Sequence, residues 1–470
     1  MADRRKLSFL VALATLGGCS MAPRYQPPKI AMPAVYKEAG PWVPVSPAGT
    51  AVVSDRWWTV FQDADLNALE DRIEKGSPTL EAALGRYDAA RAYLTQTRAE
   101  LYPHVGVGAD FTRNRQSDNR PLRGRNQPDL YASTMVGGEV SYDLDLWGRV
   151  RDSVAARRAE AQASGDDLGA IRISLEGQLA SDYVALRGYD REIELLQATV
   201  SAYAEADRMT RRRFSGGIAN GMETGQSGAQ LAEAEAQLAD LQNERALTEH
   251  AIASLVGTPA SEFSITSRSE ILALPQVPVN LPSTLLQRRP DVAAAEQRMI
   301  AANARIGVAR AAFFPAISLG GSGGFQSTAV SGLIAAPNIF WSVGPSVLLS
   351  LFDGGRNRGR LAQAKAEWTQ STADYRGHVL EAMQQVEDGL SRLHHLGDEE
   401  SAEGRAVDQA AQVERLALNR YQKGAVSYLD VITAQATALR TRRQSIQLGT
   451  RRLQATIALI RALGGGWSQV

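Results

Sequence analysis

The chain has 470 residues, and its formal net charge is +0 because 51 Lys and Arg balance 51 Asp and Glu. A balanced charge excludes recruitment of nucleic acid or of an anionic surface by the field of the whole molecule, so partners must be recognised by shape. Cys19 is the only cysteine in the sequence, which excludes a disulfide within the chain.

The N-terminal region has the parts of an export signal followed by a linker. A positively charged start, an apolar run at residues 7–16 and a pair of glycines make residues 1–18 a predicted signal peptide. Residues 19–60 hold many prolines and few aliphatic side chains, so we expect an extended N-terminal linker there. The Trp57-Trp58 pair near its end opens the structured region.

Residues 61–260 are predicted to contain both helices and strands. Val105, Val107 and Ala109 alternate with polar residues or glycine, which indicates a strand with one apolar face and one polar face. The expected elements in chain order are a helix at 64–101, strands at about 104–113 and 131–146, and long helices at 149–214 and 222–257.

Residues 261–470 repeat this order of elements. The expected elements are a helix at 283–313, strands at about 316–326 and 338–352, and long helices at 356–423 and 427–463. Equivalent prolines are separated by one constant interval, as in Pro78 with Pro290 and Pro103 with Pro315. A repeat of such long period indicates two copies of one structural unit.

The stretch 311–352 contains no Asp, Glu, Lys, Arg or His, which indicates contact with lipid or a deep core. A transmembrane helix would need about 20 apolar residues, but Pro315, Pro337 and Pro345 would break it. Tilted strands of about 10 residues are long enough to cross a bilayer. The core of a soluble β-sandwich is the alternative.

Four membrane-spanning strands per chain cannot stand alone. Unpaired backbone groups in hydrocarbon cost several kcal/mol each, and the smallest barrels of this kind have about 8 strands. If the strands span a membrane, several chains must therefore share one barrel.

The two longest predicted helices contain no proline and would be roughly 100 Å long at 1.5 Å per residue. Apolar residues recur along the helices at spacings of three and four, as a packing seam requires. Arg245 and Arg443 interrupt the seams of the two returning helices at matching heptad positions. A plain antiparallel coiled coil is the alternative to a helical tube.

No set of residues in the sequence suggests catalysis. The five histidines are scattered, and His394 and His395 are expected to point to different helix faces, so no metal site is predicted. The glycine-rich run 320–324 lacks the lysine and the helix of a phosphate-binding loop, and close approach of strands explains it better. We therefore expect no enzyme activity and no nucleotide role.

Several short motifs stand in the second copy. They are Leu281-Pro282-Ser283, Arg288-Arg289-Pro290-Asp291-Val292, Ala302-Asn303-Ala304, Ile306-Gly307 and Phe314-Pro315. Together with the duplication, they resemble the TolC-like outer membrane factor family, specifically the NodT-type efflux outer membrane lipoproteins. The resemblance implies an α+β membrane protein with four transmembrane β-strands per chain. It also implies a homotrimer whose 12-stranded barrel continues into a long periplasmic α-helical barrel.

The sequence Leu16-Gly17-Gly18-Cys19 resembles the bacterial lipoprotein box, in which the cysteine is acylated and becomes the mature N-terminus. Ser20 in place of an aspartate is compatible in that family with sorting to the outer membrane. A covalent lipid on Cys19 is therefore expected, and no other cofactor. The alternative is an incidental cysteine beside an ordinary cleavage site.

Two glycine-containing turns are expected at the end of the long helices farthest from the barrel, where a periplasmic mouth would lie. Gly217, Gly221 and Gly424 mark these turns. The resemblance implies that Tyr421 and Asp430 occupy positions that help to hold the entrance shut in relatives. A second acidic position of the relatives is Thr433 here, which departs from the pattern. Alternatively, Asp430 is a solvated residue in the first turns of a helix.

Three acidic residues on the polar face of the second strand are candidates for the water-filled lumen. They are Glu139, Asp143 and Asp145. Strand-end charges near the membrane interface are the alternative explanation.

The resemblance implies an outer membrane exit channel of a tripartite multidrug efflux system that passes small amphiphilic compounds. Its expected partners are a periplasmic adaptor (membrane fusion protein), an inner-membrane pump of the resistance-nodulation-division class and outer membrane lipid, with no nucleic acid. Two alternatives remain, the outer membrane channel of a type I protein secretion system and a periplasmic helical scaffold lipoprotein that does not span the membrane.

Overall fold

The computed structural model describes residues 20–31, 33, 35–38, 53–54, 56–117, 119, 128–270, 272–275 and 289–467. The predicted signal peptide and Cys19 lie outside the described residues. The chain forms two compact units. The first unit comprises residues 1–29, 86–165 and 294–375, and the second comprises residues 30–85, 166–293 and 376–470.

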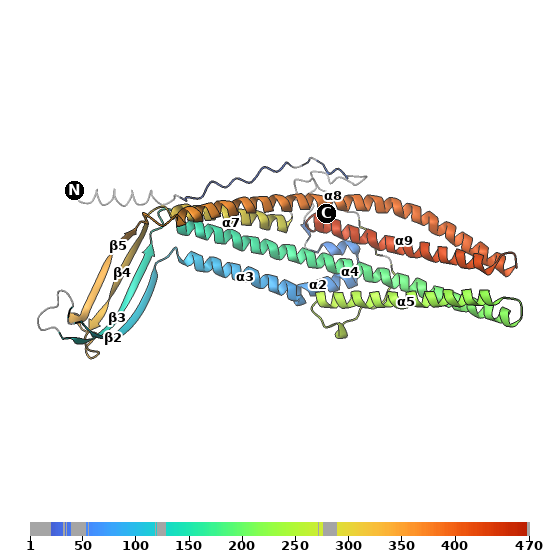
Figure 1. The fold of residues 1–470 in the computed structure, drawn as a ribbon, viewed down its shortest axis with the longest axis horizontal. Coiled ribbons are helices and arrows are strands. Elements are labelled where there is room, and N and C mark those ends of the chain that lie inside the picture. Colours follow the sequence, from blue (N-terminus) through green and yellow to red (C-terminus); the bar gives the residue numbers. More distant parts are fainter. Residues whose placement is uncertain are drawn as a thin grey trace. The chain divides into compact units, whose positions relative to one another are not determined.

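The first unit contains a four-stranded antiparallel sheet in the order β2-β3-β4-β5 (Figure 1). The strands are β2 (His104–Arg115), β3 (Leu130–Asp143), β4 (Ala316–Ser327) and β5 (Ile339–Leu348). The hairpins of the two copies therefore join into one sheet through the β3–β4 ladder. In that ladder Gly137 lies opposite Gly324, and a Cβ on Gly324 would collide with the backbone of β3.

Two strands end earlier than predicted. β3 ends at Asp143 and β5 ends at Leu348, whereas the alternating pattern extended to residues 146 and 352. Leu144 still donates a backbone hydrogen bond of 2.8 Å to Ile317. The next acidic residue, Asp145, leaves the sheet and accepts hydrogen bonds from the first turn of the following helix, which ends the strand.

Apolar side chains on one face of the sheet are exposed in the single chain, as the alternation predicted. Val107 is 84% exposed, Trp341 is 76% exposed and Val343 is 66% exposed. Exposed apolar patches of this kind normally mark contact with a partner or with a membrane.

Paired helix lengths make the duplication visible in the structure. α3 (Pro78–Ala99) and α7 (Pro290–Ala311) have 22 residues each, α4 (Arg149–Ser215) and α8 (Arg356–Gln422) have 67, and α5 (Gly221–Leu255) and α9 (Tyr428–Ala462) have 35. At 1.5 Å per residue, α4 and α8 are each about 100 Å long.

The predicted helix at 64–101 is two helices. α2 (Ala64–Gly76) begins after Asp63, whose carboxylate accepts a hydrogen bond of 2.8 Å from Leu66 N–H. Pro78 begins α3, because proline is tolerated only in the first turn of a helix. No described helix is both long and apolar enough to cross a membrane.

In the second unit, part of the predicted linker is a folded core. Trp57 and Trp58 belong to a short 3-10 helix, η1 (Trp57–Phe61), and are 2% and 3% exposed. Trp57 donates a hydrogen bond of 3.1 Å to Glu176 on α4. Near η1, β1 (Val53–Ser54) pairs with β6 (Gly466–Trp467) close to the C-terminus. The sequence placed this aromatic pair where the structured region opens, and its burial makes it part of the core.

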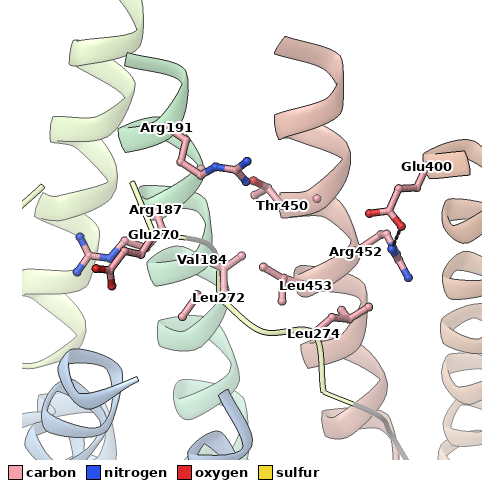
Figure 2. A pocket seen from close by; sticks show the side chains of 12 residues that line it. Val184, Arg187, Arg191, Glu270, Leu272, Leu274, Glu400, Thr450, Arg452 and Leu453 are labelled. Atoms are coloured by element: carbon pink, nitrogen blue, oxygen red, sulfur yellow. Dashed lines mark hydrogen bonds and ion pairs between the residues drawn. The ribbon is translucent and has the colours of Figure 1, made fainter. Parts of the chain in front are cut away.

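The chain after α5 forms a short 3-10 helix, η2 (Ala260–Glu262), and then an extended segment within the second unit. Leu272 and Leu274 of this segment point into a cavity of about 100 Å³ between α4 and α9, beside Val184 and Leu453 (Figure 2). The segment therefore fills the space between the two helices with apolar side chains.

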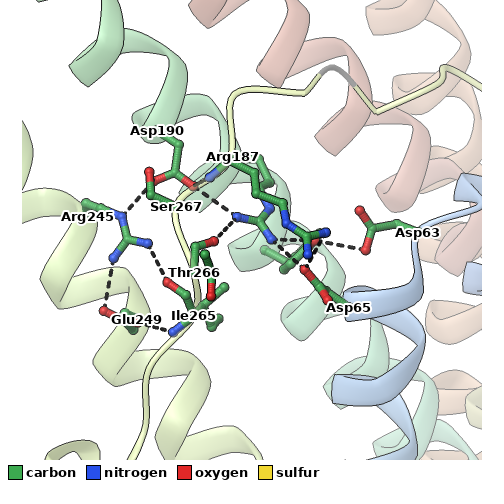
Figure 3. A network of polar contacts seen from close by, with 11 residues as sticks. Asp63, Asp65, Arg187, Asp190, Arg245, Glu249, Ile265, Thr266 and Ser267 are labelled. Atoms are coloured by element: carbon green, nitrogen blue, oxygen red, sulfur yellow. Dashed lines mark hydrogen bonds and ion pairs between the residues drawn. The ribbon is translucent and has the colours of Figure 1, made fainter.

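A polar network fastens the same segment to α4 and α5 (Figure 3). Arg245 on α5 donates to Asp190 on α4 at 2.7 Å and to the Ile265 carbonyl at 2.8 Å. Arg187 also pairs with Asp190, at 3.1 Å, and Ser267 donates to the same carboxylate at 2.8 Å. The arginine that interrupts the apolar seam of α5 is thus satisfied by a buried carboxylate.

One carboxyl in the second unit is buried without a partner. Glu70 on α2 is 0% exposed, and neither of its carboxyl oxygens has a hydrogen-bond partner. Desolvation, with a smaller contribution from the charge of Glu176, raises the pKa of Glu70 to about 10. Burial of this carboxyl therefore requires that it carry a proton.

The variant Glu70→Gln is expected to be more stable than the parent protein at and above neutral pH. The native carboxyl binds a proton up to about pH 10, whereas the unfolded carboxyl ionises near 4.5, so the stability of the parent protein falls as pH rises through this window. The thermal unfolding midpoint, measured from about pH 5 to about pH 9, should decline less in the variant, and the difference at the alkaline end should be on the order of a few kcal/mol.

Glu74→Gln is the matched control, because Glu74 lies one turn further along α2, is about half exposed and pairs with Arg172. An identical pH dependence in Glu70→Gln and Glu74→Gln would contradict the assignment of a protonated Glu70.

Candidate functional site

The two long helical hairpins end in the same turn. Gly217 after α4 and Gly424 after α8 have φ values of 72° and 74°, in the region that favours glycine. In each turn the residue after the glycine donates back to a helix carbonyl, Ile218 to Arg213 and Ala425 to Arg420. This is the Schellman pattern of helix C-termini, so both glycines are required by the backbone.

Gly221 has a different place from the one predicted. It is the first residue of α5, and Asn220 before it caps the helix by accepting a hydrogen bond of 3.0 Å from Glu223 N–H. Its φ is not in the left-handed region, so the turn itself depends on Gly217.

Tyr421 lies in a small apolar cluster at the second turn. It is 7% exposed and packs with Tyr428 and Val431, the two tyrosine rings lying 5.3 Å apart. The guanidinium of Arg213, from the end of α4, lies 4.9 Å from the centre of the Tyr421 ring, within the range of a cation–π interaction. The cluster therefore links the ends of the two hairpins.

Burial changes the acid–base behaviour of both tyrosines. Desolvation raises the pKa of Tyr421, and the nearby Arg213 opposes this. Desolvation also raises the pKa of Tyr428, to about 12. Both phenols are therefore neutral at physiological pH, and the Tyr421 hydroxyl, which faces Glu223 and Thr210, is buried without a well-formed hydrogen bond.

A buried carboxylate on α4, that of Asp207, holds the two helices of the first hairpin together. Asp207 accepts hydrogen bonds from Arg211 at 2.6 Å and from Ser227 at 2.8 Å. The hydrogen bond from Arg211 lowers the pKa of Asp207. Sequence reasoning missed Arg213, Tyr428 and Asp207. The alignment of Arg213 with Arg420 in the two copies was the available signal for the first of them.

Asp430 caps the start of α9. Its carboxylate accepts a hydrogen bond of 3.0 Å from Ser427 N–H and one of 2.7 Å from the Ser427 hydroxyl. Its side chain is exposed, and Thr433 on the next turn donates to the Leu429 carbonyl. The structure thus gives Asp430 a local role at the helix terminus.

The three predicted lumen residues have different surroundings. Glu139 is exposed on β3, opposite Gly106, and a Cβ on Gly106 would lie 3.4 Å from the Glu139 carboxylate. Asp143 forms an ion pair of 2.9 Å with Arg149. Asp145 accepts from Val150 N–H at 3.1 Å and from Arg151 N–H at 2.9 Å, so it caps α4.

The residues that follow Cys19 lie against one stripe of α7. Arg310 donates to the Met21 carbonyl at 3.1 Å, Asn303 donates to the Pro23 carbonyl at 2.8 Å, and Tyr25 donates to Glu296 at 3.1 Å. These α7 residues are spaced by seven, so they share one face of the helix and hold the segment antiparallel to it.

Gly307 and Asp152 complete the surface against which residues 20–25 pack. A Cβ on Gly307 would lie 2.7 Å from Ala22 N and would collide with the Asp152 carboxylate. The Ser20 hydroxyl donates to Asp152 at 2.6 Å. Burial raises the pKa of Asp152, and the Ser20 hydrogen bond opposes that shift. Residues 20–25 are therefore specifically docked, although the sequence predicted only an extended linker.

The predicted orientation of His394 and His395 is wrong. His394 and His395 were expected to point to different faces of α8, but their ring centres are 5.2 Å apart. Neighbouring helix positions differ by only about 100° around the axis, so long side chains on them can converge.

Comparison with known proteins identifies the family. Residues 69–258 and 281–465 match the model of the outer membrane efflux protein family. The outer membrane protein OprJ of Pseudomonas aeruginosa is 32% identical over 468 residues, which cover 98% of this chain and 96% of OprJ. The toluene efflux pump outer membrane protein TtgI of Pseudomonas putida is 31% identical and covers 98% of each chain.

Solved structures agree with the family assignment. A membrane protein from Pseudomonas aeruginosa superposes with a TM-score of 0.88 at 31% identity, covering 96% of this chain and 98% of that one. The MtrE outer membrane channel of Neisseria gonorrhoeae, in its open state, gives a TM-score of 0.82 at 26% identity, with 95% and 98% covered.

The fold is therefore shared with solved structures that cover nearly the whole chain. The chain belongs to the outer membrane efflux protein family, the TolC-like outer membrane factors, and is a transport channel rather than an enzyme.

Proposed function

We propose that the chain forms the outer membrane exit channel of a tripartite efflux system and passes small amphiphilic compounds to the outside. The observation that carries this proposal is the four-stranded sheet with an exposed apolar face, formed by both copies of the duplication. Lipid accounts for such a face on strands of about 10 residues. Relatives that match the whole chain are named for efflux of solvents, toluene and cations.

The functional assembly is a homotrimer. Within the four-stranded sheet, β2 and β5 are edge strands, each with one side unpaired. An edge in hydrocarbon leaves backbone groups without hydrogen bonds, so β5 of one chain must pair with β2 of the next. Three chains supply twelve strands, an even number within the range of closed outer membrane barrels.

A periplasmic adaptor and an inner-membrane pump of the resistance-nodulation-division class are the proposed partners. The chain belongs to a family of outer membrane efflux proteins, and we assign the supply of energy for transport to another protein. The turns at Gly217 and Gly424 are the surfaces that we assign to the approach of the adaptor.

The chain is anchored by a lipid on Cys19. The docking of residues 20–25 along α7 supports this proposal, because it fixes the chain directly after the cysteine to a rigid helix. An acyl chain attached next to a docked segment would be held at one height relative to the strands. Two acyl chains give stable membrane attachment, whereas one gives only marginal binding.

The channel function is tested by deletion and by conductance. Cells that lack the gene should lose tolerance to amphiphilic drugs or dyes and regain it from a plasmid copy, and the purified protein should form ion-conducting pores in planar bilayers. A strain that keeps drug tolerance but loses an exported polypeptide would instead indicate a protein secretion channel. A lipid-free monomer without pores would contradict the proposal.

Asp430→Ala is expected to destabilise the first turn of α9 by about 1 kcal/mol, because the Ser427 N–H loses its acceptor. Hydrogen exchange of the amides at 427–432 should accelerate, while the amides near Gly217 stay unchanged. Thr433→Ala is the control, since its hydroxyl bonds only within the helix. If single-channel conductance rises in Asp430→Ala without a change in exchange, Asp430 acts at the gate and not as a cap.

Gly307→Ala is expected to displace residues 20–25 from α7, because the added methyl group would meet Ala22 N and the Asp152 carboxylate. Hydrogen exchange at Met21 and Ala22 should accelerate strongly in the variant. Gly359→Ala on α8 is the matched control, since no atom lies within 4 Å of the position that its added methyl group would take. Equal protection of the segment in both variants would contradict the docking.

A further inference from the structure

We propose that His394, His395 and Asp398 form a binding site for one divalent transition-metal ion on α8. Their ligand atoms all lie within 4.8 Å of one another, and the three side chains are exposed. Among the described residues, this is the one group of three or more histidine, cysteine or acidic side chains with such geometry. The site is independent of the proposed channel function.

Helix geometry explains why the three side chains converge. An α-helix turns by about 100° per residue, so Asp398 lies about 40° from His394 and about 60° from His395 around the axis. Asp398 is also one turn further along the helix and stands above the gap between the two rings. Its carboxylate is 3.9 Å from His394 Nε2, and the two rings meet edge to face.

The chemistry of the three donors selects the class of ion. Imidazole nitrogens suit Zn²⁺, Ni²⁺ and Cu²⁺, whereas Mg²⁺ and Ca²⁺ prefer sites built from oxygen alone. Zinc–ligand bonds of about 2.0–2.1 Å require donors closer together than 4.8 Å. Rotation of these exposed side chains supplies this small approach.

The neighbouring acids are already engaged, which leaves Asp398 for the ion. Glu399 pairs with Arg451 at 2.7 Å, and Glu400 pairs with Arg452. The Asp398 side chain is 75% exposed, and among the described residues His394 alone lies within ion-pair distance of it. Three protein ligands leave at least one coordination position open to water or to a group from another molecule.

The ion would also brace a weak turn of α8. Gly397 lies inside the three-residue group, and a Cβ there would meet no atom within 4 Å, so no packing contact requires glycine. Glycine in a helix interior costs roughly 0.5–1 kcal/mol relative to alanine. A metal ion held by residues on successive turns would offset that cost, because it ties the turn before Gly397 to the turn after it.

Zinc titration of the purified full-length protein in detergent tests the site. Isothermal calorimetry should give one Zn²⁺ per chain for the wild type and for His250→Ala, which removes an exposed histidine on α5 that lies outside the group of three ligands. The double variant His394→Ala/His395→Ala should bind Zn²⁺ at least about tenfold more weakly, since it keeps one of three ligands. Replacement of Zn²⁺ by Mg²⁺ should abolish the heat of binding.

Two further measurements make the result decisive. Co²⁺ should give visible absorption bands with the wild type that are absent in the double variant, which reports inner-sphere ligation. Hydrogen exchange at residues 394–401 should slow on addition of Zn²⁺ in the wild type, and circular dichroism should show that the double variant is still folded.

Three outcomes would overturn the proposal. The first is absence of Zn²⁺ binding by the wild type. The second is equal affinity in the folded double variant, which would place the ion elsewhere. The third is equal binding of Mg²⁺, which would indicate only attraction to surface charge.

Discussion

The structure depends on one constraint, that strands in hydrocarbon must have every backbone N–H and C=O paired. The ladder between β3 and β4 meets this within the chain, since it joins the hairpins of the two copies. Only β2 and β5 then remain as edges of the four-stranded sheet. A duplicated chain therefore leaves two edges where separate hairpins would leave four, and association of identical chains removes the last two.

The helices meet the same constraint in another way, because each α-helix forms hydrogen bonds between its own backbone N–H and C=O groups. Side-chain packing must then decide which helices lie together, and the duplication alone cannot do this. Arg245 on α5 pairs with Asp190, and Arg443 on α9 pairs with Glu192. Both acids belong to α4, so one helix supplies partners to a helix from each copy. The two ion pairs therefore hold α5 and α9 to the same helix.

Much of the fold could be predicted from the sequence because its signals are long and periodic. The strands and the 67-residue helices follow from alternation and from the absence of proline. The errors occur where a single side chain determines where a helix or strand begins or ends. Pro78 begins a second helix, and Asp145 caps α4. Burial of Trp57 and docking of residues 20–25 depend on contacts far apart in the chain, which no local pattern encodes. The candidate site was found only in part, since Tyr421 and the glycines have local motifs but Arg213 acts across hairpins.

The turns that end the two helical hairpins differ in their packing although they come from equivalent positions of the duplication. Phe214 and Tyr421 occupy equivalent positions before the same turn, yet Phe214 is 50% exposed and Tyr421 is 7% exposed. The difference comes from Tyr428, which packs on Tyr421, and from Arg213, which the first copy contributes to the ring of the second. One hairpin supplies a cation and the other an aromatic surface, so movement of either hairpin alone must break the contact. Such a contact holds the two hairpins together only weakly, because a cation–π interaction near the surface is worth only about 0.5–1 kcal/mol.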